Sequence, residues 1–124
     1  MNVVDSSGWL EYFSAGPNAN FFVPAIKDTA QLIVPVICVY EVFKRILQQQ
    51  GLGVAETNIA DLYNGELVNL TSSLAISAAV ISDQLKLPMA DSFILAVSRV
   101  YQAVLWTQDE HFKDIEGVKY IAKN

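Results

Sequence analysis

Four acidic residues of this sequence stand in apolar surroundings, which is unusual for carboxylates on a solvated surface. Asp5 and Asp109 follow short apolar runs that predict strands, and Glu41 and Asp91 lie in apolar stretches that predict buried helices. Carboxylates that are held close together repel one another and raise each other's pKa. A bound divalent cation removes this conflict, and ligation by oxygen alone favours Mg²⁺ or Mn²⁺ over zinc. The acids therefore predict a site for Mg²⁺ or Mn²⁺.

Asp91 has the least ordinary setting of these acids. Pro88 cannot continue a preceding helix, so Asp91 falls in the first turn of a new one. The following residues, Phe93 to Val97, form no polar stripe, which is typical of a helix buried on nearly all sides. An unpaired charge carried toward the interior costs several kcal/mol or shifts its pKa. The simple alternative is that Asp91 serves the helix N-terminus, where a negative charge is favourable by about 0.3–1 kcal/mol.

The other acids also have local explanations. Asp5 could cap the helix that follows it, and Asp109 could be a turn residue in the segment TQDEH. Glu41 could pair with Lys44 or Arg45, which contributes only tenths of a kcal/mol on a helix surface. Each explanation is adequate for one residue. In an α/β protein, ligands bind at the carboxyl ends of the parallel strands. If all the local explanations held, four acids would have gathered at this end of the sheet by coincidence.

Composition and charge limit the class of protein. The chain has 124 residues, enough for one domain, and 52% of them are hydrophobic. The net charge of −5 argues against binding through a broad basic surface, although carboxylates that hold a metal ion would make any nuclease look acidic. The longest apolar run, Leu32 to Tyr40, is too short to span a membrane, and the N-terminus has no signal-peptide pattern. We therefore expect a cytoplasmic protein.

Cysteine and histidine each occur once. Cys38 alone excludes an internal disulfide and a cysteine-cluster zinc site, and its apolar surroundings indicate core packing. His111 alone excludes a histidine-rich metal site. A Ser/His/Asp triad through His111 has no nucleophile-elbow motif to support it.

Short apolar runs alternate with helical patterns along the whole chain. The predicted strands are residues 2–4, 31–34, 67–70, 104–106 and 118–121. The predicted helices are 6–13, 20–27, 35–50, 54–63 and 72–85, with a sixth that runs from the turn at 86–91 to about 101. Short buried strands alternating with helices favour an α/β domain with a central parallel sheet of four to five strands between helical layers.

The order of these motifs resembles the PIN domain family, and within it the VapC-type toxins of toxin–antitoxin pairs. The resemblance covers the whole chain and rests on VVDSS at 3–7, Pro35 to Glu41, LPMADSFILAVSR at 87–99 and TQDEHF at 107–112. It implies a single PIN-like domain over residues 1–124 with a three-layer sandwich fold. One departure is the segment Ile37-Cys38-Val39, where the family often carries Ser or Thr before the glutamate.

The resemblance also implies an activity. It implies a Mg²⁺- or Mn²⁺-dependent ribonuclease in which a metal-activated water attacks the phosphodiester. Asp5, Asp91 and Asp109 would be direct ligands, and Glu41 would hold a second ion or act through water. Two hydroxyls, on Ser7 and Thr107, would orient the carboxylates. The candidates for contacting RNA phosphates are Lys44, Arg45, Lys86, Arg99 and Lys113, for which plain solvation is the alternative.

The expected partners are RNA, a second copy of the chain and an antitoxin. The surplus of apolar residues in Asn20–Ile26 and in the helix after Pro35 predicts an exposed apolar groove. The resemblance implies that an amphipathic helix or extended tail of an antitoxin fills it. A phosphatase with an aspartate nucleophile is a rival, but its second aspartate would stand at Ser7. The other rival is a PIN-like scaffold that acts through protein binding; such scaffolds usually lack some of the acids that are present here.

Overall fold

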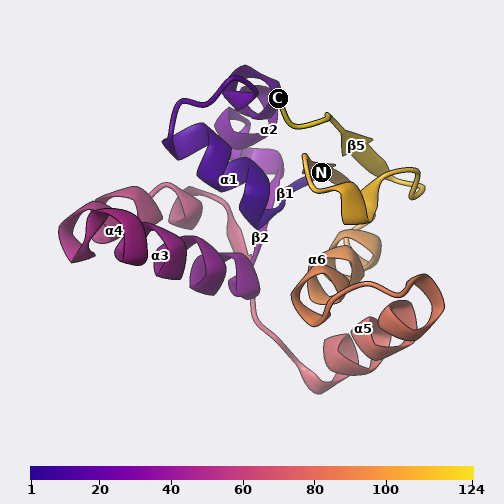
Figure 1. Cartoon of the computed structure of the whole chain (residues 1–124). Coiled ribbons are helices and arrows are strands. Elements are labelled where there is room, and N and C mark those ends of the chain that lie inside the picture. The colour runs from indigo at the N-terminus through magenta and orange to yellow at the C-terminus, as the bar shows by residue number, and fades with distance from the viewer.

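Strands and helices alternate in the computed structural model, which describes residues 1–124 (Figure 1). The strands are β1 (Asn2–Val4), β2 (Leu32–Pro35), β3 (Glu66–Val68), β4 (Val104–Thr107) and β5 (Val118–Tyr120). The helices are α1 (Ser6–Phe13), α2 (Ala19–Lys27), α3 (Val36–Gln50), α4 (Leu52–Ile59), α5 (Ser72–Leu85) and α6 (Met89–Val100). Short 3₁₀ turns, η1 (Thr29–Gln31), η2 (Leu62–Asn64) and η3 (Glu110–Phe112), precede β2, β3 and β5.

All strands are parallel and form one sheet in the order β3-β2-β1-β4-β5. The central strand β1 pairs with β2 on one side and with β4 on the other, and Val4 lies opposite Trp106. Because every strand runs in the same direction, the residues that follow β1 and β4 emerge at the same edge of the sheet. This carboxyl edge is where α/β proteins bind their ligands.

Helices enclose the sheet and complete the core. Figure 1 shows α5 and α6 together at one side of the molecule and α1 to α4 at the other. Helix α6 contacts β1, β2 and β4, whereas α1 and α2 both contact β1. The core is one cluster of 26 buried residues, and Val3 and Val4 of β1 are fully buried within it. The predicted α/β fold, a parallel sheet between helical layers, is confirmed.

The helix that begins near Asp91 is buried as the sequence predicts. Pro88 is the N-cap of α6, and Asp91 lies in the first turn. Beyond it, every residue from Ile94 to Ser98 is buried, because α5 covers one face of α6 and the sheet covers the other. The start of α6 therefore lies at the carboxyl edge of the sheet, and the helix carries Asp91 to that edge.

Some predicted boundaries are wrong by a few residues. The fourth helix covers 52–59 rather than 54–63, because Gly51, with a φ of 89°, ends α3 and leads directly into α4. The chain then tightens into the 3₁₀ turn at Leu62–Asn64. The third strand covers 66–68 rather than 67–70, since its partner β2 ends at Pro35, which pairs with Val68. Pro35 is the last residue of β2 and the N-cap of α3, so it lies just before the first turn of the helix rather than within it.

The expected apolar groove on the early helices is wrong in part. Phe22 and Ile26 of α2 and Ile46 of α3 belong to the core, because these apolar faces turn toward the sheet. Tyr40 and Leu47, which are 59% and 41% exposed, lie on the surface as expected, and Phe21, Val39 and Phe43 are half-buried. None of the helices has both the length and the apolar character that a membrane span requires.

Candidate metal centre

Asp5 lies at the carboxyl end of the central strand, in a nearly complete set of hydrogen bonds. Its Oδ1 accepts from the backbone N–H of Gly8 at 2.9 Å and from Oγ of Ser7 at 2.7 Å. Its Oδ2 accepts from Oγ1 of Thr107 at 2.6 Å. Asp5 is therefore the N-cap of α1, as the simple alternative proposed, but it is also bound to the end of β4. Both hydroxyls predicted to orient a carboxylate contact this one.

Burial makes the charge of Asp5 expensive. The residue is only 2% exposed, and the loss of hydration raises its pKa to about 7. The hydrogen bonds from Thr107, Ser7 and Gly8 lower the pKa but do not compensate, and the nearby Asp109 carboxylate raises it further. A positive charge beside Asp5 would restore its ionised form.

Asp91 and Asp109 approach each other around the imidazole of His111. Nδ1 of His111 lies 3.0 Å from Oδ2 of Asp91 and 3.1 Å from Oδ1 of Asp109. One ligand atom from each of these side chains lies within 4.8 Å of the other two. Oδ1 of Asp109 also accepts from the backbone N–H of His111 at 2.9 Å, so Asp109 caps the short turn η3 as well. The alternative that Asp109 is only a turn residue accounts for this capping contact but not for its contact with the imidazole of His111.

The pKa of Asp91 is raised to about 6. The largest cause is burial, since the side chain is only 15% exposed, followed by repulsion from Asp109. Glu41 also raises the pKa, whereas His111 lowers it. The carboxylates of Asp109 and Glu41 therefore both lie within electrostatic reach of Asp91.

Glu41 reaches this edge from α3. Its Oε1 accepts from Oγ of Ser6 at 2.6 Å, and it forms no ion pair with Lys44 or Arg45. The surface-pair explanation for Glu41 is therefore wrong, because the side chain turns toward α1 instead of along its own helix. Cys38, one turn earlier, is buried in the core as expected, and burial raises the pKa of its thiol.

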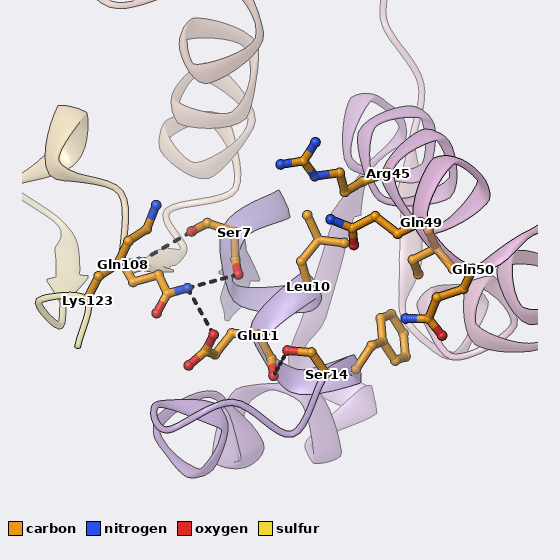
Figure 2. Close-up of a pocket in the computed structure, with 11 residues that line it drawn as sticks. Ser7, Leu10, Glu11, Ser14, Arg45, Gln49, Gln50, Gln108 and Lys123 are labelled. Atoms are coloured by element: carbon orange, nitrogen blue, oxygen red, sulfur yellow. Dashed lines mark hydrogen bonds between the residues drawn. The ribbon is translucent and has the colours of Figure 1, made fainter.

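A polar hollow of about 260 Å³ lies between α1, α3 and the C-terminal segment. None of the four predicted acids lines it, but Ser7, which donates to Asp5, does. Figure 2 shows Arg45 and Lys123 on opposite sides of this hollow, with Ser7 and Glu11 of α1 between them. Gln108 lines the hollow, and its amide donates to Oε1 of Glu11 at 3.4 Å (Figure 2). In the sequence it stands between Thr107, which donates to Asp5, and Asp109, so it connects the hollow to these acids. This hollow between α1 and α3 is therefore lined mainly by polar residues, unlike the apolar groove that the sequence predicts.

The basic residues predicted to contact RNA do not share one surface. Arg45 lines the polar hollow, and Lys113 is exposed directly after η3. Lys44 contacts the Tyr40 hydroxyl at 3.4 Å. Lys86 is exposed at the α5–α6 turn, 3.9 Å from Asp83. Arg99 lies beside Val104, where β4 begins, and this is the edge of the sheet opposite the acids.

The structure adds residues that the sequence reasoning missed. His111 belongs to the acidic cluster, Ser6 binds Glu41, and Lys123 lines the hollow. The spacing of two residues between Asp109 and His111 was a usable signal, because both flank one turn. Lys123 had no signal in the sequence, since only the folded C-terminal segment brings it near α1.

The donor set fits a divalent cation. Two carboxylate oxygens and one imidazole nitrogen converge at the Asp91–Asp109–His111 cluster. Burial is the main cause that raises the pKa of Asp5 and of Asp91, the Asp109 carboxylate raises both further, and a bound cation would favour the ionised forms. The cluster differs from the all-oxygen set that the sequence predicts, because it offers one nitrogen donor, Nδ1 of His111. Asp5 and Glu41 lie outside this tight group.

The fold and the site together define an α/β protein with an acidic centre at the carboxyl edge of a parallel sheet. The family model described as "PIN domain" matches residues 3–118, and the chain belongs to this family. The predicted resemblance is confirmed. A comparison with curated protein sequences finds no significant match.

Solved structures share the fold over nearly the whole chain. A toxin–antitoxin complex from Klebsiella pneumoniae is 21% identical, with a TM-score of 0.80 and 96% of each chain covered. VapC20 from Mycobacterium tuberculosis, described as a toxin that cleaves the sarcin–ricin loop, is 18% identical, with a TM-score of 0.76 and coverage of 94% and 95%. The DNA-bound VapBC of Salmonella typhimurium is 12% identical, with a TM-score of 0.75 and coverage of 98% and 97%. At these identities the likeness extends to the fold.

Proposed function

We propose that this protein is a divalent-metal-dependent ribonuclease and the toxin of a toxin–antitoxin pair. The observation that carries the proposal is the convergence of Asp91, Asp109 and His111 beside the buried carboxylate of Asp5, at the ligand-binding edge of a PIN-domain sheet. The similar fold of VapC20, a toxin described as cleaving the sarcin–ricin loop, supports RNA as the substrate.

Each acid has a distinct role in this proposal. Asp91 and Asp109 would hold Mg²⁺ or Mn²⁺ at the exposed side of the site, and Asp5 would be the deepest ligand. Ser7 and Thr107 hold the Asp5 carboxylate in one orientation, and Ser6 holds that of Glu41. When bound, the ion lowers the pKa of a coordinated water and stabilises charge that develops on the phosphate.

The polar hollow is the proposed path for the RNA backbone. Arg45 and Lys123 stand on its two sides, and their charges would attract phosphates to an otherwise acidic molecule (Figure 2). Ser7 and Gln108 line the same hollow and adjoin Asp5 and Asp109 along the chain. A phosphodiester in the hollow would therefore lie next to the carboxylates. Lys44, Lys86 and Lys113 are peripheral candidates for the same backbone.

The proposal extends to partners. A toxin of this kind would be neutralised by an antitoxin, which the toxin–antitoxin complex with the same fold supports. It would also act in the cytoplasm and form a homodimer. The antitoxin could bind exposed apolar side chains on α3 and α4, where Tyr40, Leu47 and Leu52 are 59%, 41% and 55% exposed. An amphipathic antitoxin segment would cover this patch.

A cleavage assay tests the activity. The purified protein is incubated with structured RNA in Mg²⁺, in Mn²⁺ and in EDTA, beside the variants Asp109→Asn and Asp83→Asn. We expect cleavage with either ion, none in EDTA and none by Asp109→Asn, with 5′-phosphate product ends. Asp83→Asn, an exposed residue outside the site, should cleave like the wild type. Cleavage in EDTA, or 2′,3′-cyclic phosphate ends, would contradict a metal-activated water. A folded protein that cleaves no RNA would favour the scaffold alternative.

A further inference from the structure

His111 holds a position that neither a surface histidine nor a core histidine requires. Its Nδ1 faces two carboxylate oxygens at once, from Asp91 of α6 and Asp109 at the end of β4, at 3.0 and 3.1 Å. Its side chain is 56% exposed, so the point between these atoms is reached from solvent. It is also the only histidine in the chain, so no other imidazole offers this chemistry.

We propose that Nδ1 of His111 is a direct ligand of the bound ion, together with Asp91 and Asp109, and that this nitrogen shifts the metal preference of the site from Mg²⁺ toward Mn²⁺ and the later transition metals. The inference rests on the proposed function, because it concerns the same metal site. It changes the ligand set from oxygen alone to nitrogen and oxygen. Oxygen ligands suit Mg²⁺, whereas imidazole suits transition metals.

The distances agree with ligation. Neighbouring ligands of an octahedral ion lie about 3.0 Å apart when each is about 2.1 Å from the metal. The Nδ1–Oδ distances of 3.0 and 3.1 Å therefore match two edges of such an octahedron, and no side chain has to move far to admit the ion. In the metal-free site Nδ1 is hydrogen-bonded to Oδ2 of Asp91 at 3.0 Å, and Oδ1 of Asp109 lies 3.1 Å away.

The two states differ in which nitrogen carries the proton. In the metal-free protein Nδ1 faces two acceptors and must be a donor. In the metal-bound protein the lone pair of Nδ1 binds the ion, so the proton is on Nε2. A histidine that only oriented Asp91 and Asp109 would keep its Nδ1–H and would remain a donor when the ion binds. The two roles of His111 therefore predict opposite tautomers.

NMR on protein labelled with ¹⁵N-histidine separates these roles, since the single imidazole gives one pair of nitrogen signals. Zn²⁺ serves as the diamagnetic probe, and the thermal melting temperature reports independently whether the ion binds. We expect Zn²⁺ to raise the melting temperature and to convert the imidazole from the Nδ1–H to the Nε2–H form. A raised melting temperature with Nδ1 still protonated would overturn the assignment of His111 and leave the proposed function intact. No effect of Zn²⁺, Mn²⁺ or Mg²⁺ on melting would overturn both.

Variants test the metal preference without reference to activity. Binding of Mn²⁺ and Mg²⁺ is measured by calorimetry on the wild type, His111→Ala, His111→Asp and the exposed neighbour Glu110→Gln. We expect His111→Ala to lower the ratio of Mn²⁺ to Mg²⁺ affinity at least about tenfold. His111→Asp should bind both ions with the preference of an all-oxygen site, and Glu110→Gln should match the wild type. An unchanged ratio in His111→Ala would contradict the proposal.

Discussion

Replacing Asp5 with asparagine should stabilise the metal-free protein above neutral pH. The folded pKa of Asp5 is about 7, against 3.8 for an ordinary aspartate, because the carboxyl is buried. At about 1.4 kcal/mol for each pH unit, holding the ionised group in the fold costs about 4 kcal/mol. The neutral amide avoids this cost. Its NH₂ group cannot accept from Thr107, a loss of about 1 kcal/mol, so the net gain should be at most about 3 kcal/mol.

The gain should depend on pH in a defined direction. Between about pH 4 and pH 7 the folded wild type binds more protons than the unfolded chain, since its Asp5 pKa is raised. The stability of the wild type without metal therefore falls as pH rises through this window, and the Asp5→Asn variant lacks the contribution of this residue. At about pH 5 the folded wild type is largely protonated at Asp5, and the variant should then be equal or slightly less stable.

Urea unfolding in EDTA at about pH 5 and about pH 8 measures both effects. Asp83→Asn is the matched control, because Asp83 is exposed and should show no such pH-dependent difference. Adding Mn²⁺ should then stabilise the wild type more than the variant, if Asp5 is a ligand. An Asp5→Asn variant that is no more stable than the wild type at pH 8 would refute the reasoning. It would mean that the hydrogen bonds from Ser7, Gly8 and Thr107 outweigh the cost of burial.

Further predictions concern the surroundings of the site. Ser6→Ala leaves Glu41 without its 2.6 Å hydrogen bond, so RNA cleavage should fall several-fold while the melting temperature changes little; equal rates would show that Ser6 does not position Glu41. Arg45→Glu should weaken RNA binding in a filter assay, whereas Arg99→Glu, at the opposite edge of the sheet, should not; an equal loss in both would reject the hollow as the RNA path. Tyr40→Glu should weaken the complex with the antitoxin while metal-dependent melting stays unchanged, and a complex of undiminished affinity would exclude the α3 patch.

Much of the fold could be predicted because its signals are local. The apolar runs at β1 and β4, and Pro88 before α6, are short-range features of the chain. The burial of α6 was predictable for the same reason, since a helix without a polar stripe can only lie between other elements. The positions of the acids relative to these elements were equally local, and parallel strands place them at one edge.

The tertiary structure alone decided which groups meet within that edge. The order β3-β2-β1-β4-β5 sets β4 beside β1, so Thr107 reaches Asp5 across 102 residues of sequence. Packing of α3 against α1 brings Ser6 to Glu41, and the turn after β4 aims His111 at Asp91. Hydrophobic periodicity records which face of an element is buried but not which element covers it. The acidic residues could therefore be recognised in the sequence, whereas the position of the His111 imidazole beside Asp91 depended on how the strands and helices pack.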